Sequence, residues 1–334
     1  MTYYRPLPCT DSARPKNALP LAGGWCWFDR VERIEREGSS GLISVDEVPE
    51  EQRERLSNER ARIAGLQFDA PRLMGILNVT PDSFSDGGVH FAADQAIKHC
   101  QSMVAAGANI IDIGGESTRP GAEEVEISEE KRRTAPVIEA VRNLAAPISI
   151  DTRKFEVARA AYEAGATLVN DVSGLEFDPK LAPFCVEAGL PVCVMHSQGT
   201  PEFMQKNPRY SDVVLDVYDY LEVRVNALCE MGIAREKIII DPGIGFGKTL
   251  EHNLALLQNL SLFHGIGCAV LLGASRKRFI GTIGGSDEAH KRVPGSLAVA
   301  LAGVAQGVQV LRVHDVGETS EAIKLWNAAT LGRK

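Results

Sequence analysis

The chain has 334 residues, and its hydrophobic content of 44% and charged content of 24% are ordinary for a soluble globular protein. Its net charge of −8, with Lys131-Arg132-Arg133 as the longest basic run, argues against general nucleic-acid binding. No apolar stretch approaches the roughly 20 residues that a membrane span needs, so we expect no membrane association.

The seven cysteines are odd in number, widely spaced and without a C-x-x-C pair. This pattern is typical neither of a disulfide framework nor of a zinc site, and it favours reduced thiols. The first residues, Met1–Pro6, also lack the apolar core of a secretion signal. We therefore expect a cytoplasmic protein.

Residues 1–71 differ from the rest and form a predicted N-terminal extension of unknown role. Prolines punctuate its start, and Trp25–Phe28 supplies a compact aromatic cluster. Asp29–Glu37 and Glu47–Arg62 are heavily charged, and we expect each to form a surface helix. Two of the three tryptophans lie here, which indicates that the extension packs on another part of the protein.

From Arg72 onward, short apolar runs alternate regularly with helical patterns. Such a run, when it is β-branched and flanked by helices, is typical of a strand buried on both faces. The eight runs are Leu73–Leu77, Ile110–Ile113, Ile148–Ile150, Leu168-Val169, Val192–Met195, Ile238–Ile240, Val270–Leu272 and Val308–Leu311. The helical patterns cover about 91–107, 128–145, 154–165, 178–189, 212–232, 250–263, 294–307 and 319–329. Together they predict an α/β fold, a (β/α)8 TIM barrel over residues 72–334.

Each apolar run ends on or near a polar residue that an ordinary core would not contain. These residues include Asn78, Asp112, Asp151, Asn170, His196, Asp241, Ser275, Lys277, Arg312 and His314. In a parallel barrel the carboxyl ends of all strands meet on one rim. Desolvating so many polar groups in one place is costly unless a polar ligand satisfies them. We therefore expect an enzyme with a polar, anionic substrate.

Three strand-to-helix connections, 79–90, 115–127 and 197–211, are longer than usual, and long loops at this end of a barrel are usually functional. The first contains Asp82 and follows Asn78. Their oxygens suit a hard cation such as Mg²⁺, which needs few protein ligands when phosphate oxygens supply the rest. An ordinary turn-forming loop is the alternative.

The acidic strand ends also have a purely structural interpretation. Asp151 or Asp241 taken singly is better explained by helix capping or an ion pair. The three residues Asp151, Asn170 and Asp241 together favour a ligand site, because helix caps need not converge. The glycine-rich turn that follows Asp241 is not a Walker A motif, since Pro242 occupies the position of its first glycine.

Arg312 and His314 alternate with apolar neighbours, so both point to the same side at the end of the eighth strand. That end of a barrel is a frequent phosphate site, and arginine suits bidentate contact with a diphosphate. A lone histidine is more often structural, but one placed two residues from this arginine favours anion binding.

Eight segments in register closely resemble the dihydropteroate synthase family. They are Met74–Gly88, Ile111–Ala122, Ser149–Lys154, Asn170–Gly174, Met195-His196, Asp241–Lys248, Gly273–Lys277 and Arg312–Asp315. The resemblance covers about residues 72–331. It implies the condensation of p-aminobenzoate with the diphosphate ester of 6-hydroxymethyl-7,8-dihydropterin, which gives 7,8-dihydropteroate and pyrophosphate in folate biosynthesis.

The resemblance also implies roles for individual residues. Asp151, Asn170, Met195, Asp241 and Lys277 would bind the pterin. Arg312 and His314 would bind the departing pyrophosphate, with Mg²⁺ held at Asn78, and Lys277, Arg312 and His314 are the expected catalytic residues. Phe246 and Ser275 resemble walls of the aminobenzoate pocket. The expected lid residues, of which Thr118 and Arg119 also contact substrate, are Asp82, Phe84, Thr118, Arg119 and Pro120.

The resemblance further implies a homodimer formed through the C-terminal helices and a site at which sulfonamides mimic p-aminobenzoate. The Leu297–Val304 face could equally be barrel-facing core, and Ala274 replaces a Met-like residue of the family. Two other functions are the alternatives, and the presence of Arg312, His314 and Asn78 argues against both. A pterin-binding methyltransferase barrel would share the pterin-facing residues but would not need Arg312, His314 and Asn78, and a catalytically silent homologue should have lost some of them.

Overall fold

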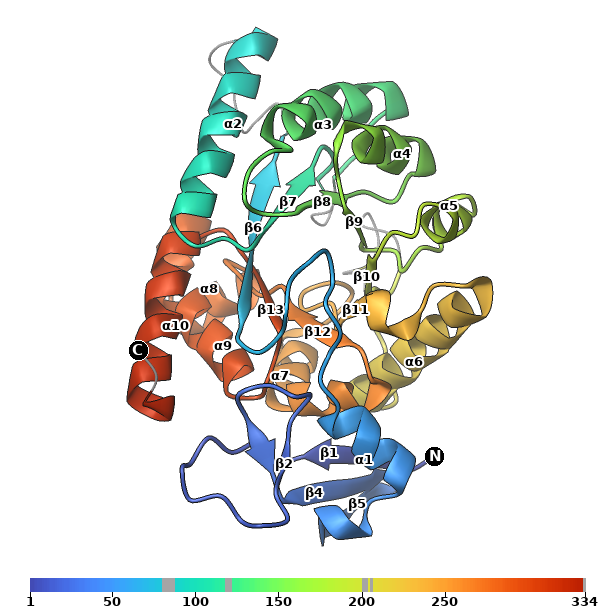
Figure 1. The fold of residues 1–334 in the computed structure, drawn as a ribbon, viewed down its shortest axis with the longest axis vertical. Helices are drawn as coiled ribbons and strands as arrows, with labels where there is room; N and C mark the ends of the chain where they lie inside the picture. Colours follow the sequence, from blue (N-terminus) through green and yellow to red (C-terminus); the bar gives the residue numbers. More distant parts are fainter. Residues whose placement is uncertain (80–87, 118–121, 200–203, 205–206, 333–334) are drawn as a thin grey trace.

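The computed structural model describes residues 1–79, 88–117, 122–199, 204 and 207–332. Eight parallel strands close into a barrel in chain order (Figure 1). They are β6 (Arg72–Asn78), β7 (Ile110–Gly114), β8 (Ile148–Asp151), β9 (Leu168–Asp171), β10 (Val192–Met195), β11 (Ile238–Asp241), β12 (Ala269–Leu272) and β13 (Val310–Val313). The predicted TIM barrel is confirmed. The last strand begins at Val310 instead of Val308, so Arg312 lies within the strand.

Helices surround the barrel, and most lie where the sequence predicts them. They are α2 (Gly88–Ala105), α3 (Ile127–Val141), α4 (Phe155–Ala164), α5 (Leu181–Glu187), α6 (Val213–Met231), α7 (Leu250–Gln258), α9 (Val293–Val304) and α10 (Val316–Leu331). The sequence predicts one helix over 250–263, but the structure has two. The helix α7 ends at Gln258, and a 3-10 helix, Leu260–Ile266, follows it. A further helix, α8 (Arg278–Gly284), is not predicted. No helix in the described part of the chain is long and apolar enough to cross a membrane.

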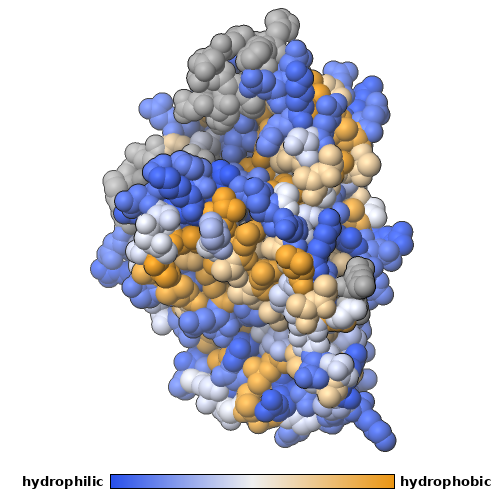
Figure 2. All heavy atoms as spheres, turned by 90° about the vertical axis from the view of Figure 1, so that its left-hand side faces the viewer, coloured by the Kyte–Doolittle hydropathy of each residue, from blue (hydrophilic) through white to orange (hydrophobic). Residues whose placement is uncertain are grey.

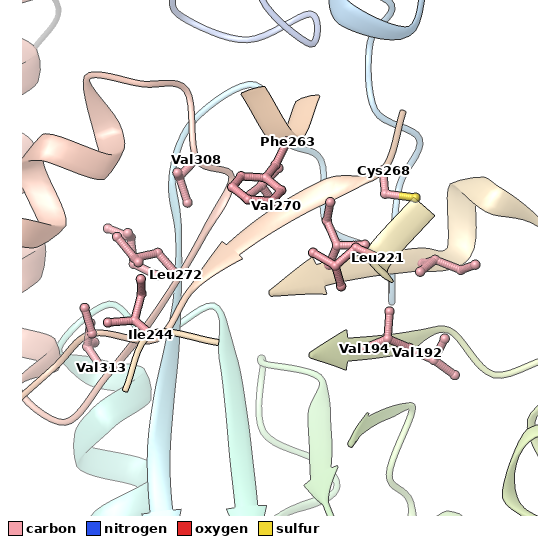
Figure 3. Close-up of a cluster of buried hydrophobic side chains, with 14 of the residues drawn as sticks. Val192, Val194, Leu221, Ile244, Phe263, Cys268, Val270, Leu272, Val308 and Val313 are labelled. Atoms are coloured by element: carbon pink, nitrogen blue, oxygen red, sulfur yellow. The ribbon is translucent and has the colours of Figure 1, made fainter. Parts of the chain in front are cut away.

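Side chains along the barrel strands alternate between the helices and the barrel interior. Apart from Asp171 at the end of β9, those with a side chain that faces the helices are apolar, and Figure 3 shows Val194, Val270 and Leu272 in the same cluster as Leu221 of α6. A separate apolar layer fills the interior at the amino ends of the strands. It consists of Met74, Ile110, Leu168, Cys193, Ile239, Ala269, Leu271 and Val310.

The extension forms a three-stranded antiparallel sheet in the order β1-β4-β5, with β1 at Tyr3–Pro6, β4 at Arg30–Glu35 and β5 at Gly38–Ser44. A two-stranded sheet, β2 (Leu19–Pro20) with β3 (Trp27–Phe28), and the helix α1 (Glu50–Ser57) complete it. The expected helix at Asp29–Glu37 is therefore wrong, because β4 pairs with strands on both sides. The helix expected at Glu47–Arg62 is present but shorter.

The extension packs against the amino end of the barrel (Figure 1). The indole Nε1 of Trp25 donates to the carbonyl oxygen of Val304 at 2.8 Å, so the expectation that the tryptophans pack on another part of the protein holds for Trp25. Ile63 and Phe68 join the inner apolar layer of the strands and close the barrel at this end. The described residues thus close the barrel interior at its amino end, and we expect a ligand site inside the barrel to open at the carboxyl ends of the strands.

Candidate active site

On four of the barrel strands a polar side chain occupies the inward-facing position two residues beyond the inner apolar layer. Asp112 follows Ile110 in this way, and Asn170, Asp241 and Arg312 stand at the equivalent places on β9, β11 and β13. The register pairs Asp151 with Asn170 on neighbouring strands and Met195 with Asp241. A Cβ built on Gly273 would lie 3.4 Å from Asp241 Oδ2 and 4.0 Å from Arg312 Cβ, which places these two side chains on either side of it.

A hydrogen-bonded cluster joins four of these side chains. Arg312 donates from Nε to Asp112 Oδ2 and from Nη2 to Asp151 Oδ2, each at 2.6 Å. Asn170 Nδ2 donates to Asp112 Oδ2 at 3.0 Å. Asp112 is the member of this cluster that the site prediction omits, although its place in the middle of an apolar strand was a signal for it. The arginine, predicted as a diphosphate ligand, lies here between two carboxylates.

The cluster has more negative than positive charge when both aspartates are ionised, and it is buried. Burial, together with the nearby Asp112 carboxylate, raises the pKa of Asp151 to about 7, against the lowering effect of Arg312. Burial also raises the pKa of Asp241. Two buried acceptors, Asp112 Oδ1 and Asp151 Oδ1, have no hydrogen-bond donor among the described residues. A ligand that presents N–H groups would satisfy both oxygens.

The glycine-rich turn after β11 is held against the end of β10. Asp241 Oδ1 accepts from the backbone N–H of Gly243 at 2.7 Å. Gly243 has φ +72°, and a Cβ at this position would lie 1.9 Å from the carbonyl oxygen of His196, so only glycine fits. Lys248 Nζ lies 2.9 Å from His196 Nδ1 and 3.0 Å from the carbonyl oxygen of Phe246.

Both members of this Lys–His pair have a pKa well below the usual value for their side chain. Burial lowers the pKa of Lys248 to about 7, and burial together with Lys248 lowers the pKa of His196 to about 2. The imidazole is therefore neutral, and its Nδ1 shares a hydrogen bond with the Lys248 amine. His196, one of the polar residues at the predicted strand ends, is thus joined through Lys248 to the turn that carries Phe246.

Two further contacts bring predicted residues together at the mouth. Lys277 Nζ lies 4.0 Å from the centroid of the Phe246 ring, in a cation–π arrangement. His314 Nδ1 lies 3.1 Å from Ser275 Oγ, which also accepts from the His314 backbone N–H. Asn78 ends β6 and pairs in register with Gly114. Asp82, Phe84, Thr118, Arg119 and Pro120 lie outside the described residues.

A family model for pterin binding enzymes matches residues 74–314, which is more than half of the chain. Over 278 residues the chain is 47% identical to the dihydropteroate synthase of Escherichia coli K12, a match that covers 82% of this chain and 96% of that protein. The chain belongs to the dihydropteroate synthase family. The stretch 74–314 that the family model matches contains every predicted site residue and none of residues 1–71.

Solved structures of dihydropteroate synthases give the same result. The Yersinia pestis enzyme, in a sulfonamide drug complex, is 45% identical with a TM-score of 0.76, and the match covers 80% of this chain and 98% of that one. The Xanthomonas albilineans enzyme with 4-aminobenzoic acid is 45% identical with a TM-score of 0.75, covering 80% of this chain and 96% of that one.

Proposed function

We propose that the chain condenses p-aminobenzoate with 6-hydroxymethyl-7,8-dihydropterin diphosphate, releasing 7,8-dihydropteroate and pyrophosphate in folate biosynthesis. The observation that supports this most directly is the pair of buried carboxylate oxygens, Asp112 Oδ1 and Asp151 Oδ1, inside the barrel mouth. The amino-pyrimidinone edge of a pterin carries N–H donors that match them. A site built from buried acceptors rejects analogues that leave those acceptors unpaired.

In this proposal the pterin lies in the barrel mouth. Asp112 and Asp151 accept from its N–H groups through their Oδ1 atoms, and Asp241 accepts from a further N–H. Asn170 pairs through its amide, and Lys277 donates to a ring acceptor. Met195, which is buried at the end of β10 beside Asp241, contacts the ring. The carboxylates must be ionised to accept both donors, so the raised pKa of Asp151 links pterin binding to proton release.

The diphosphate is assigned to the mouth side of Arg312, with His314 beside it. The Arg312 side chain is 21% exposed, so the guanidinium borders the opening although it pairs with Asp112 and Asp151. Its charge stabilises the departing pyrophosphate while the C–O bond at the pterin methylene breaks. The arylamine nitrogen forms the new C–N bond and then loses a proton, and since that amine is uncharged near neutral pH no strong general base is needed.

Magnesium is proposed as a cofactor that binds with the diphosphate. The described residues contain no group of three or more His, Cys, Asp and Glu side chains that could hold a metal ion. The donor that fits is the amide oxygen of Asn78 at the end of β6, since Mg²⁺ needs few protein ligands when phosphate oxygens and water supply the others. When bound, the ion would neutralise charge on the leaving group.

The aminobenzoate side is assigned to Phe246, Ser275 and Lys277, an assignment supported by the contact of Lys277 with the Phe246 ring and of Ser275 with His314. Thr118, Arg119 and Pro120, with Asp82 and Phe84, are proposed to complete this pocket and to exclude water from the reactive pterin. Sulfonamides, which mimic p-aminobenzoate, are expected to compete there.

Assembly and compartment are proposed as well. Figure 2 shows apolar side chains gathered on the side of the molecule where α10 lies, and Ile283 of α8 and Leu325 of α10 are 61% and 63% exposed. We assign this face to the interface of a homodimer. A monomer mass from size-exclusion chromatography with light scattering would contradict this assignment.

A cytoplasmic location is proposed as well. All seven cysteines are free thiols, which supports it.

The test of the reaction is Mg²⁺-dependent pyrophosphate release from the dihydropterin diphosphate, with and without p-aminobenzoate. Release that requires both substrates and yields dihydropteroate is the expected result. Tight pterin binding without release would favour a catalytically silent homologue, and absence of pterin binding would overturn the assignment of the barrel mouth.

A further inference from the structure

The glycine-rich turn that follows β11 is held on both sides by hydrogen bonds and close backbone packing. The Tyr210 hydroxyl donates to the carbonyl oxygen of Gly247 at 2.7 Å, and the backbone N–H of Gly245 donates to Asn253 Oδ1 of α7 at 2.6 Å. A Cβ built on Gly247, which has φ +60°, would lie 2.7 Å from the carbonyl oxygen of Gln198. The turn is therefore packed tightly against the segment that follows β10.

Lys248 makes the bonds that join this turn to the end of β10. Its side chain is buried, and its Nζ lies 3.0 Å from the carbonyl oxygen of Phe246, 3.3 Å from that of His196 and 2.9 Å from His196 Nδ1. None of these three partner groups is a carboxylate. A buried amine is costly to desolvate, and a methionine of similar length would avoid that cost. It would, however, leave both carbonyl oxygens without this donor.

The contacts of Lys248 are satisfied whether or not its amine carries the extra proton. The ammonium form donates to both carbonyl oxygens and to His196 Nδ1. The neutral form is also populated, because burial lowers the pKa of Lys248 to about 7. It keeps two N–H donors for the carbonyl oxygens and accepts from Nδ1–H of the other imidazole tautomer. Both forms therefore hold the turn in the same place.

Two parts of the turn contact Lys277. Its Nζ lies 4.0 Å from the centroid of the Phe246 ring. A Cβ built on Gly245 would lie 3.2 Å from Lys277 Cδ, so the backbone of the turn packs against the stem of this side chain. Lys277 is the N-cap of α8, and its backbone N–H donates to the carbonyl oxygen of Ala274 at 3.3 Å. Thus α8 fixes the Lys277 backbone, whereas the turn fixes the direction of its side chain.

We propose that Lys248 is a positioning residue that fixes Phe246, and through it the ammonium group of Lys277, for aminobenzoate binding. The inference rests on the proposed function, which assigns the aminobenzoate side to Phe246, Ser275 and Lys277. Lys248 bonds the carbonyl oxygen of Phe246 itself and both polar atoms that His196 presents to it. One side chain therefore sets the distance between the end of β10 and the aromatic wall.

The test uses the full chain and the substitution Lys248→Met, which removes the donors but keeps most of the side-chain volume. We expect the KM for p-aminobenzoate to rise roughly tenfold, because small displacements of binding groups are amplified in this way. The dissociation constant for the pterin substrate should rise by a clearly smaller factor, since Asp112, Asp151 and Asn170 stand on other strands. Pyrophosphate release measures the KM, and titration calorimetry measures the dissociation constant.

Tyr210→Phe is a second variant, which loosens the same turn without removing a charge. It deletes the hydroxyl that bonds the carbonyl oxygen of Gly247. The KM for p-aminobenzoate should rise by a smaller factor than in Lys248→Met, and the pterin dissociation constant should stay at its wild-type value. Because the aromatic ring remains, this variant decides the matter if Lys248→Met does not fold.

Lys237→Met is the matched control. Lys237 stands directly before β11, is exposed, and donates from Nζ to the carbonyl oxygen of Gly189 at 3.0 Å. The same substitution therefore removes the same kind of bond at the opposite end of the same strand, and both constants should equal those of the wild type.

Hydrogen exchange gives a readout that does not depend on activity. The backbone N–H groups of Gly245 and Phe246 donate to Asn253 Oδ1 and to the carbonyl oxygen of Gly243 within the turn. Their exchange should be faster in Lys248→Met and Tyr210→Phe than in the wild type or Lys237→Met.

The outcomes separate the inference from the proposed function. An inactive wild-type protein would overturn the proposed reaction and with it this inference. An active wild type with an unchanged KM for p-aminobenzoate in Lys248→Met and Tyr210→Phe would overturn the positioning role alone. A loss of pterin affinity as large as the rise in that KM would also overturn it, since it would indicate a general structural role.

Discussion

The two ends of the barrel use the same alternation of inward-facing side chains but differ in chemistry. At the amino ends of the strands, Ile110 and Leu168 meet Phe68 of the extension in a closed apolar layer. Two residues further along the same strands, Asp112 and Asn170 belong to a charged, hydrogen-bonded cluster. The apolar layer is complete in itself, whereas the charged cluster contains buried oxygens that lack donors among the described residues.

This difference implies a division of labour between stability and binding. Removing atoms from the apolar end should lower the free energy of unfolding and leave ligand binding alone. Changing the polar end should alter binding and turnover, because the cluster becomes fully satisfied only with a ligand. Substitutions at the two ends therefore test the comparison directly.

The largest effect is expected for Arg312→Ala. Its loss should lower kcat by about 10²- to 10³-fold, as the removal of one group that stabilises transition-state charge does in other enzymes. The KM for p-aminobenzoate should change little. Pyrophosphate release under saturating substrates measures this, with Arg312→Lys retaining part of the rate because the charge remains. An unchanged kcat would exclude the arginine from the leaving-group role.

At the opposite end, Phe68→Ala should destabilise the protein by about 3–5 kcal/mol, the usual cost of truncating a buried aromatic side chain. Phe68 is 2% exposed and lies in the layer that closes the barrel. Chemical denaturation measures the loss, and Phe68→Leu should recover most of it. The pterin dissociation constant of the folded variant should equal that of the wild type, and a weaker value would show that the two ends are not independent.

Asp151→Asn should weaken pterin binding by about 10- to 100-fold, because a hydrogen bond to a charged group contributes roughly 1.5–3 kcal/mol. The amide also replaces an acceptor oxygen by a donor that would oppose the pterin N–H. Titration calorimetry with the pterin substrate gives the dissociation constant. If that constant stays at its wild-type value, Asp151 does not belong to the pterin site.

The raised pKa of Asp151, about 7, predicts that pterin affinity increases with pH. Its ionised fraction rises from about a tenth at pH 6 to about nine tenths at pH 8, so affinity should rise roughly tenfold. The contribution of Asp151 to the free energy of unfolding depends on pH in the opposite direction to the pterin affinity. It is fully present below the unfolded pKa of about 3.9 and is lost as the pH rises through 7. A flat affinity profile in Asp151→Asn is the control, and a flat wild-type profile would contradict the assignment.

The strand ends were predictable because the signals are local. Asp151, Asn170 and Asp241 each close an apolar run, and a parallel barrel brings such ends together without further information. Asp112 was noted as a polar residue in an apolar run but was given no role in the site, since its position does not identify its partner. That partner, Arg312, lies 200 residues away in the chain.

Other features depended on partners that the sequence does not identify. The bonds between Glu116, Glu130 and Lys154 join three elements, and no motif spacing connects them. The extension contains a second feature that the sequence did not predict. Arg30–Glu35 is as rich in charged residues as many surface helices are, yet it forms the strand β4. Its buried Val31 faces the interior while its charged residues remain outside, and pairing with β1 and β5 decides its conformation.

The smallest expected effect tests whether the extension acts only through packing. The Tyr3 hydroxyl donates to the Asp219 carboxylate of α6, at 2.9 and 3.0 Å from its two oxygens. Tyr3→Phe should lower the free energy of unfolding by about 1 kcal/mol, the usual net contribution of a hydrogen bond. Tyr4→Phe, at the next position of β1, is the matched control and should leave stability unchanged. Neither variant should alter kcat or the pterin dissociation constant, because Tyr3 belongs to the apolar end of the barrel. A kinetic change in Tyr3→Phe alone would mean that the extension also influences the mouth.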